Sequence, residues 1–267
     1  MKSNYFKSVS GVILTVIVLK CCTPSYGQSI GSPVIKDTVT TWQWKFLLEP
    51  YLMFPNMNGT IGLGTLPNGE VDEEASDIFV KLKFGAMIYF EAYSPKWVFS
   101  SDMLYMNLGA DITPKTIINY GDADAKQLGW EVAVLHRLFP ILNVGIGMQL
   151  NSIKSELRLN VNTPGGPQDR DREISETWLD PMIIARLKLP ITKRLIIQVR
   201  PSIGGFGIGS DLAWQIQAHA SYRFSHLFQL SLGYRVIDIE YEKGEGSDRF
   251  LYDMNTFGPV LRLGFNF

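Results

Sequence analysis

The last stretch of the chain alternates two kinds of side chain. One set of alternate positions holds Phe257, Pro259, Leu261, Leu263, Phe265 and Phe267, and the positions between hold Gly258, Val260, Arg262, Gly264 and Asn266. Successive side chains of a strand point to opposite faces, so this pattern predicts a strand with one apolar and one small or polar face. A soluble domain rarely leaves such a strand at a sheet edge, where it would invite pairing. A closed barrel in lipid has no edges and needs an apolar outer face.

The same alternation recurs along the chain, as a series of β-strands requires. The expected strands are roughly 42–53, 83–94, 97–108, 127–138, 142–161, 177–189, 194–203, 211–224, 227–241 and 250–267. Ten is an even number of strands, which would leave both chain termini in the periplasm. An additional hairpin around residues 60–64 and 70–72 makes twelve strands the alternative, and eight would require demoting two good segments.

The connections between these strands alternate in length. Short turns are expected at 94–96, 139–141, 190–193 and 225–227, and long polar or glycine-rich connections near 55–82, 109–126, 162–176, 203–211 and 242–249. Tight periplasmic turns and longer outer loops are typical of bacterial outer-membrane barrels. The pattern therefore predicts an all-β fold, a single transmembrane antiparallel up-and-down β-barrel over residues 41–267.

A soluble β-sandwich or lipocalin-like barrel also alternates faces, with its apolar face inward. Two features favour the membrane barrel. The second face is rich in Gly, Ser, Gln and Asn with single charges, unlike a surface covered by Lys and Glu. Aromatic residues also gather near strand ends, as interfacial girdles would require: Trp42, Trp97, Trp130, Trp178, Tyr222, Phe224 and Phe228.

The N-terminus predicts export. Lys2 and Lys7 precede the apolar run 11–19, and Ser25 and Gly27 stand at the −3 and −1 positions of a small-residue cleavage site. This is the pattern of a signal peptide, residues 1–27, whose apolar core is too short to span a bilayer. Residues 28–40 are small and polar, as in a periplasmic lead-in. Lipidation is the less favoured alternative, because no small residue stands just before the cysteines.

Composition excludes several kinds of function. Both cysteines precede the expected cleavage site, so the mature chain offers no disulfide, thiolate metal site or cysteine nucleophile. Cleavage removes three lysines and no acidic residue, which gives a formal charge of 22 − 26 = −4. No basic block suits nucleic acid. We therefore expect no nucleic-acid partner, no cofactor and no metal.

Several runs resemble a family of uncharacterised Gram-negative outer-membrane β-barrel proteins. They are WQWKFLLEPYL (42–52), FGAMIYFEAYSPKWVFSSDMLYMNL (84–108), WLDPMIIARLKLP (178–190), IGGFGIGSDLAW (203–214), YRFS (222–225), LGYRVIDIEYE (232–242) and FLYDMNTFGPVLRLGFNF (250–267). The resemblance covers most of the mature chain. It implies a barrel in the outer membrane, in contact with lipid and lipopolysaccharide, but no activity. The terminal Phe265 and Phe267 resemble the aromatic signal read by the outer-membrane assembly machinery, which is an expected folding partner.

The polar face predicts a charged lumen. Its members are Lys45, Glu49, Glu91, Asp102, Glu131, Arg137, Asp180, Arg186, Arg200, His219, Arg223, Arg235 and Arg262. One interpretation is a conduit or pocket for solutes, and the favoured one is a packed interior of ion pairs, since buried charges need partners. A barrel of eight to ten strands has room for little beyond its own side chains, so a wide pore is not expected.

Three other patterns carry weaker hypotheses. His219 and Ser221 resemble the pair of outer-membrane lipid A deacylases, yet both are expected in the lumen, away from acyl chains, with no matching acid. The run 204–209 is glycine-rich, but no helix follows it, so a tight loop is favoured over a phosphate site. The acidic run 68–77 lacks the spacing of a calcium loop, which favours a solvated external loop.

These observations predict a monomeric, non-enzymatic outer-membrane barrel. Its role is expected to be a narrow channel or entry site for small or hydrophobic solutes, in a plan distantly similar to the outer-membrane protein W family. A structural or surface-interaction barrel acting through its outer loops is the alternative, and a lipid A deacylase-like enzyme is the second alternative.

Overall fold

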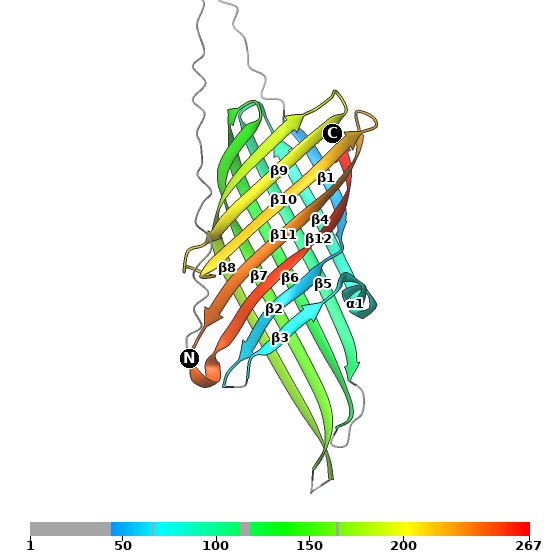
Figure 1. The fold of residues 1–267 in the computed structure, drawn as a ribbon, viewed down its shortest axis with the longest axis vertical. Helices are drawn as coiled ribbons and strands as arrows, with labels where there is room; N and C mark the ends of the chain where they lie inside the picture. The colour runs from blue at the N-terminus through cyan, green and yellow to red at the C-terminus, as the bar shows by residue number, and fades with distance from the viewer. Residues whose placement is uncertain (1–43, 66, 113–117, 164–165) are drawn as a thin grey trace, which may run out of the picture. The chain divides into compact units, whose positions relative to one another are not determined.

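The computed structural model describes residues 44–65, 67–112, 118–163 and 166–267. The predicted signal peptide, the lead-in at 28–40 and Trp42 lie outside these ranges. The described chain is built mainly from antiparallel strands that wrap into a barrel (Figure 1). Among its described residues, no helix is both long and apolar enough to cross a bilayer.

Twelve strands and two short helices make up the described chain. The strands are β1 (Lys45–Met53), β2 (Asn56–Leu63), β3 (Gly69–Glu73), β4 (Leu82–Tyr93), β5 (Trp97–Ile112), β6 (Ile118–Phe139), β7 (Leu142–Thr163), β8 (Gly166–Pro190), β9 (Leu195–Gly205), β10 (Leu212–Arg223), β11 (Phe228–Lys243) and β12 (Phe250–Asn266). The helices are α1 (Ala75–Lys81) and the 3₁₀ turn η1 (Gly246–Asp248). All strands belong to one sheet, in the order β1-β4-β5-β6-β7-β8-β9-β10-β11-β12-β2-β3.

Ten of these strands close the barrel. β1 pairs with both β4 and β12, which joins the two ends of the sheet. β2 and β3 form the additional hairpin, and β2 pairs with the outer part of β12, from Phe250 to Phe257. The predicted all-β antiparallel barrel of ten strands is therefore confirmed, together with the extra hairpin that the twelve-strand alternative placed near residues 60–72.

Backbone and aromatic contacts hold β1 and β12 together at one end of the barrel. Phe46 and Phe267 exchange two backbone hydrogen bonds of 2.8 and 3.0 Å. Their rings stack with centroids 5.7 Å apart. Since β1 and β12 meet here, the first and last described strands lie side by side, at the same end as the short turns.

The two faces of the wall separate as the alternation predicts. Inward side chains of β12, such as Met254, Val260 and Arg262, are buried, while outward Leu263 and Phe265 are exposed. We call the exposed apolar residues of the outer wall the apolar belt; they include Leu52, Ile88, Phe99, Val132, Ile146, Met148, Ile183, Ile197, Ile216, Leu232 and Leu263. Ile146 is 70% exposed and Leu232 62% exposed, which a water-facing surface seldom tolerates in a contiguous patch.

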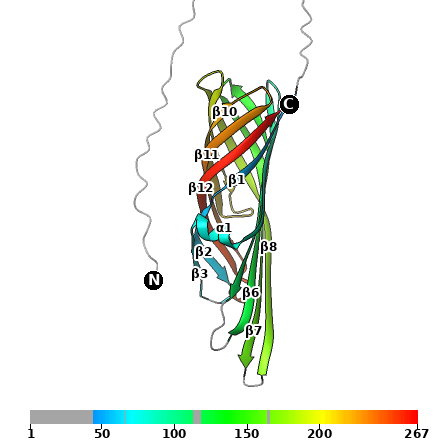
Figure 2. The ribbon, with the colours of Figure 1, turned by 90° about the vertical axis from the view of Figure 1, so that its right-hand side faces the viewer.

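Two expectations about connections are wrong. The regions 118–126 and 166–176, expected within long loops, continue the strands β6 and β8, and β7 runs to Thr163. Ion pairs join these polar strands to their neighbours: Lys126 of β6 lies 3.3 Å from Glu156 of β7, and Lys154 of β7 lies 2.9 Å from Glu173 of β8. The β6–β7–β8 sheet consequently projects beyond the rest of the barrel (Figure 2).

One aromatic residue was assigned to the wrong face. Trp178, expected in an interfacial girdle, is only 6% exposed and stacks inside on Tyr241, with ring centroids 4.0 Å apart. Its position in the alternation with Asp180 already placed it on the polar face, and its indole N–H needs a buried acceptor. Trp97, by contrast, is exposed and packs edge-on against His136.

Candidate functional site

Arginine–carboxylate pairs fill the part of the lumen that the apolar belt surrounds. Arg186 pairs with Glu91, and Arg200 pairs with Glu131. Arg235 lies 3.3 Å from Asp102. All these charged groups are at most 5% exposed. A charge buried in this way needs its partner, so each pair fixes the two strands that supply it.

Arg262 joins two of the carboxylates. Its guanidinium nitrogens lie 3.4 Å from Glu49 and 3.8 Å from Asp102. Gln217 accepts a hydrogen bond of 2.8 Å from Arg262 and donates one of 3.2 Å to Asp102. The hydroxyl of Tyr51 donates to Asp102 at 2.7 Å. Arg235, Asp102, Arg262 and Glu49 thus form one connected network. Gln215 joins Glu131 to it, because Gln215 donates a hydrogen bond of 2.6 Å to Glu131 and accepts one of 2.8 Å from Arg235.

The network leaves almost no free space. The polar cavity beside Lys188 and His219 measures about 20 Å³, and the one beside Arg235 and Arg262 about 10 Å³. A single water molecule needs roughly 10–15 Å³ of such volume. This layer of the lumen is therefore packed, and a solute of several atoms does not fit through it.

The remaining predicted lumen residues differ in their placement. Asp180 is fully buried but lies outside the ion-pair network, where it accepts hydrogen bonds from Asn151, Trp178 and Ser210. Lys45 is exposed at the start of β1. Arg137 and Arg223 are half-buried near the short turns. Phe265 and Phe267 are exposed, at 43% and 64%.

The His219–Ser221 pair points into the lumen, as expected. Both residues border the 20 Å³ polar cavity. The hydroxyl of Ser221 accepts a hydrogen bond of 2.7 Å from Ser231. Cβ atoms at Gly233, opposite His219, would lie 2.3 Å from the carbonyl of Ala218, so no acidic side chain fits there. The surroundings lack room for an acyl substrate.

The glycine-rich run folds as a tight loop between β9 and β10. Gly205 and Gly207 have φ values of 85° and 72°, which favour glycine. Gly209 lies so close to Asp180 that a Cβ atom would be 2.5 Å from Oδ1. Asp180 in turn accepts a hydrogen bond of 2.6 Å from the backbone of Ser210. The loop leads directly into β10, so the expected tight loop with no helix after it is confirmed.

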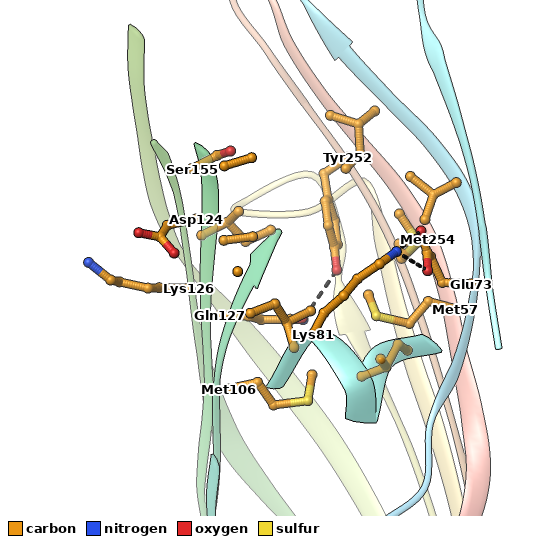
Figure 3. Close-up of a pocket in the computed structure, with 18 residues that line it drawn as sticks. Met57, Glu73, Lys81, Met106, Asp124, Lys126, Gln127, Ser155, Tyr252 and Met254 are labelled. Atoms are coloured by element: carbon orange, nitrogen blue, oxygen red, sulfur yellow. Dashed lines mark hydrogen bonds and ion pairs between the residues drawn. The ribbon is translucent and has the colours of Figure 1, made fainter. Parts of the chain in front are cut away.

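An apolar pocket lies in the outer half of the lumen, beyond the charged network. Figure 3 shows the residues that line it. Its volume is about 250 Å³. Its apolar lining includes Met57 and Ile61 of β2, Ile78 of α1, Met106 of β5 and Met254 of β12. Methionine side chains adapt to ligands of irregular shape. The pocket is large enough for a small apolar molecule.

The polar residues that border this pocket are Glu73, Lys81, Asp124, Lys126, Gln127, Ser155 and Tyr252. Tyr252 directs its hydroxyl into it and accepts a hydrogen bond of 3.2 Å from Gln127 (Figure 3). Lys81 and Glu73 form an ion pair of 2.6 Å at its rim. A mostly apolar cavity with a few placed polar groups is the usual form of a small-molecule site.

Sequence reasoning missed this pocket. Glu73 was expected in a solvated acidic loop, but residues 69–73 form β3 and residues 75–81 form α1. A polar strand pattern and a seven-residue helix give only short-range signals, and the pocket depends on which distant strands they meet. Within the described ranges, no cluster of three or more His, Cys, Asp or Glu residues has metal-binding geometry.

Comparisons with known proteins give structural similarity only. No protein-family model matches the chain, and no curated protein matches it. The outer-membrane protease OmpT from Escherichia coli is 8% identical, with 85% of this chain and 98% of that chain covered at a TM-score of 0.49. The attachment invasion locus protein Ail of Yersinia pestis is 10% identical, with coverage of 84% and 98% and a TM-score of 0.37. The Pseudomonas putida toluene transporter TodX is 9% identical, with coverage of 84% and 90% and a TM-score of 0.32.

Proposed function

We propose that this protein is an integral outer-membrane β-barrel that takes up a small apolar solute into its outer-half pocket. The observation that carries the proposal is the 250 Å³ apolar pocket closed beneath by a packed layer of ion pairs. Such a lumen offers a binding site rather than an open aqueous pore. The predicted likeness to the outer-membrane protein W family stays a prediction.

The proposed location rests on the outer wall. The apolar belt covers β1 and β4 through β12, with Trp44, Trp97, Tyr222 and Phe228 near the short turns. Lipid tails suit such a belt, and amphipathic aromatic rings suit the interface beside it. The proposal includes export by a cleaved signal peptide, insertion by the outer-membrane assembly machinery, and a monomeric state in contact with lipid and lipopolysaccharide.

Two measurements test this function. In planar bilayers the reconstituted protein should give no discrete unitary currents, because the charged layer is packed. In phosphatidylcholine vesicles it should bind 1-naphthol saturably, as measured by equilibrium dialysis against protein-free vesicles. Ala123→Phe fills the pocket and should abolish binding, whereas Ala220→Phe adds the same ring on the exposed outer face of β10 and should not. Saturable binding that survives Ala123→Phe would contradict the proposed site.

The alternative roles make different predictions. A non-enzymatic protein leaves lipid A acyl chains unchanged when it is expressed, and mass spectrometry of lipid A reads this out. Loss of one acyl chain, abolished by Ser221→Ala, would favour the enzyme instead. A surface-interaction barrel that acts through its outer loops would bind its partner equally well with Ala123→Phe in place.

A further inference from the structure

The outer half of the barrel wall has a seam. β3 pairs with β2 on one side, and in the described part of the chain no strand pairs with its other side. β4 meets β5 only as far as the pair Leu82–Leu108, so the outer end of β5 also has a free side there. The free sides of β3 and β5 are therefore the two borders of an interruption in the hydrogen-bonded wall.

The short helix α1 occupies this seam (Figure 1). The backbone of Ala75 donates a 3.0 Å hydrogen bond to the side chain of Asn56, which anchors the start of the helix to β2. Phe79 packs on Phe54, with ring centroids 5.1 Å apart. Ile78 is the buried residue of the helix, at 2% exposure. Side chains rather than a strand ladder close the wall at this point.

Apolar cavities lie on both sides of α1. The pocket in the lumen is one, and the other is a cavity of about 450 Å³ at the outer wall. The outer cavity is lined by Leu52 and Ile88 of the apolar belt as well as by inward-facing Met53. The two cavities share Ile78 and Met106 as lining residues. The two cavities therefore adjoin at these side chains.

We infer that small apolar solutes pass between the bilayer and the luminal pocket through the seam beside α1. The inference rests on the proposed function and names the route and the ligand class. An apolar solute concentrates in lipid. No charged residue of the described chain lines the outer cavity, and Ile78 and Met106, where it adjoins the luminal pocket, are apolar. The solute is a compact hydrophobic molecule with one hydrogen-bonding group, which the Tyr252 hydroxyl receives.

Blocking the outer cavity tests the route. Ala86 lines the outer cavity but not the luminal pocket, so Ala86→Phe narrows the path and leaves the binding site intact. Ala220→Phe, on the exposed outer face of β10, is the matched control. Protein in phosphatidylcholine vesicles is mixed with 1-naphthol, and loading is followed by stopped-flow energy transfer from the protein's tryptophans.

We expect Ala86→Phe to slow loading about ten-fold while the equilibrium affinity stays within about two-fold, and Ala220→Phe to change neither. If Ala86→Phe loads at the wild-type rate, the route is overturned although the binding function stands. If the wild type binds no 1-naphthol, the proposed function and the route fall together. Met103→Phe, at another residue of the outer cavity, replaces Ala86→Phe should that variant not fold.

The ligand class has its own measurement. Tyr252→Phe removes one hydroxyl from the pocket, so the affinity for 1-naphthol should fall about five- to ten-fold, while that for naphthalene should not change. Equal effects on both compounds would overturn the assignment of Tyr252 as the polar contact. Unchanged affinity for both would do the same.

Discussion

The guanidinium of Arg262 lies over the ring of Tyr51, with its central carbon 4.8 Å from the ring centroid. A cation on an aromatic face is attracted by the ring's quadrupole, and burial strengthens this attraction. The same guanidinium also pairs with Glu49 and Asp102. One side chain of β12 therefore contacts groups of the adjacent strand β1 and also reaches Asp102 of β5, which is not adjacent to β12.

Replacing this arginine should destabilise the barrel strongly. Arg262→Met leaves buried carboxylates undercompensated, which costs about 3–5 kcal/mol of the free energy of unfolding. Urea titration in lipid vesicles, followed by the heat-modifiable mobility of the folded barrel, measures the change. Lys193→Met, in an exposed turn, is the control and should change the free energy by less than about 0.5 kcal/mol. A similarly small change for Arg262→Met would contradict the network.

The Glu131–Arg200 pair should show strong coupling in a double-mutant cycle. Arg200→Met or Glu131→Leu alone leaves one buried charge without its partner, whereas the double variant leaves neither. The loss in the double variant should be smaller than the sum of the two single losses by about 1–3 kcal/mol. Additive losses within about 0.5 kcal/mol would mean that the two charges are independently solvated.

Asp180 should hold the β9–β10 loop closed. Asp180→Ala removes the acceptor of the Ser210 backbone and hydroxyl hydrogen bonds. We expect the loop to become sensitive to a protease added outside the vesicles, while the rest of the barrel stays resistant. Asp211→Ala removes an exposed carboxylate from the same loop and is the matched control. Equal resistance of wild type and Asp180→Ala would show that the loop does not need this anchor.

Two carboxylates beyond the apolar belt should give a pH dependence. Burial and the neighbouring Asp253 and Asp238 raise the pKa of Glu240, and burial and Asp238 raise the pKa of Asp253. The folded protein therefore holds these protons more tightly than the unfolded chain. The resulting stability is present at low pH and is lost as the pH rises through the raised pKa values.

Asp253→Asn should accordingly stabilise the barrel at neutral pH, by about 0.5 kcal/mol or less because both groups are substantially exposed. The gain should disappear below the ordinary pKa of an aspartate. Urea midpoints measured across this pH range provide the test, with Glu245→Gln in the exposed turn as control. A gain that is independent of pH would exclude relief of carboxylate repulsion as its cause.

The alternation of side chains predicted which residues face inward, because a strand has a fixed period of two. Glu49, Glu91 and Arg200 all lie on the predicted inward face. Trp178 was assigned to the outer face because it is aromatic, although its position in the alternation is an inward one. The partners could not be predicted. Arg262 and Glu49 are 213 residues apart, and they meet because β12 closes the barrel against β1 in one register, which no local sequence pattern specifies.

The outer half was harder to predict for a related reason. Residues 118–126 carry only small residues such as Ala123 and Ala125 on one face and charged residues such as Asp122 and Asp124 on the other, so no strongly apolar face marks them as a strand. The pocket and the seam arise where β2 replaces β1 beside β12. No short-range pattern specifies that replacement.

β12 pairs with β11, with β1 and with β2. The last strand thus pairs with three other strands. Until β12 is present, the backbone N–H and C=O groups on one side of each of these strands have no hydrogen-bond partner. During biogenesis the barrel therefore cannot close before β12 has been made. Incomplete chains would depend on a chaperone that covers the unpaired strand edges until then.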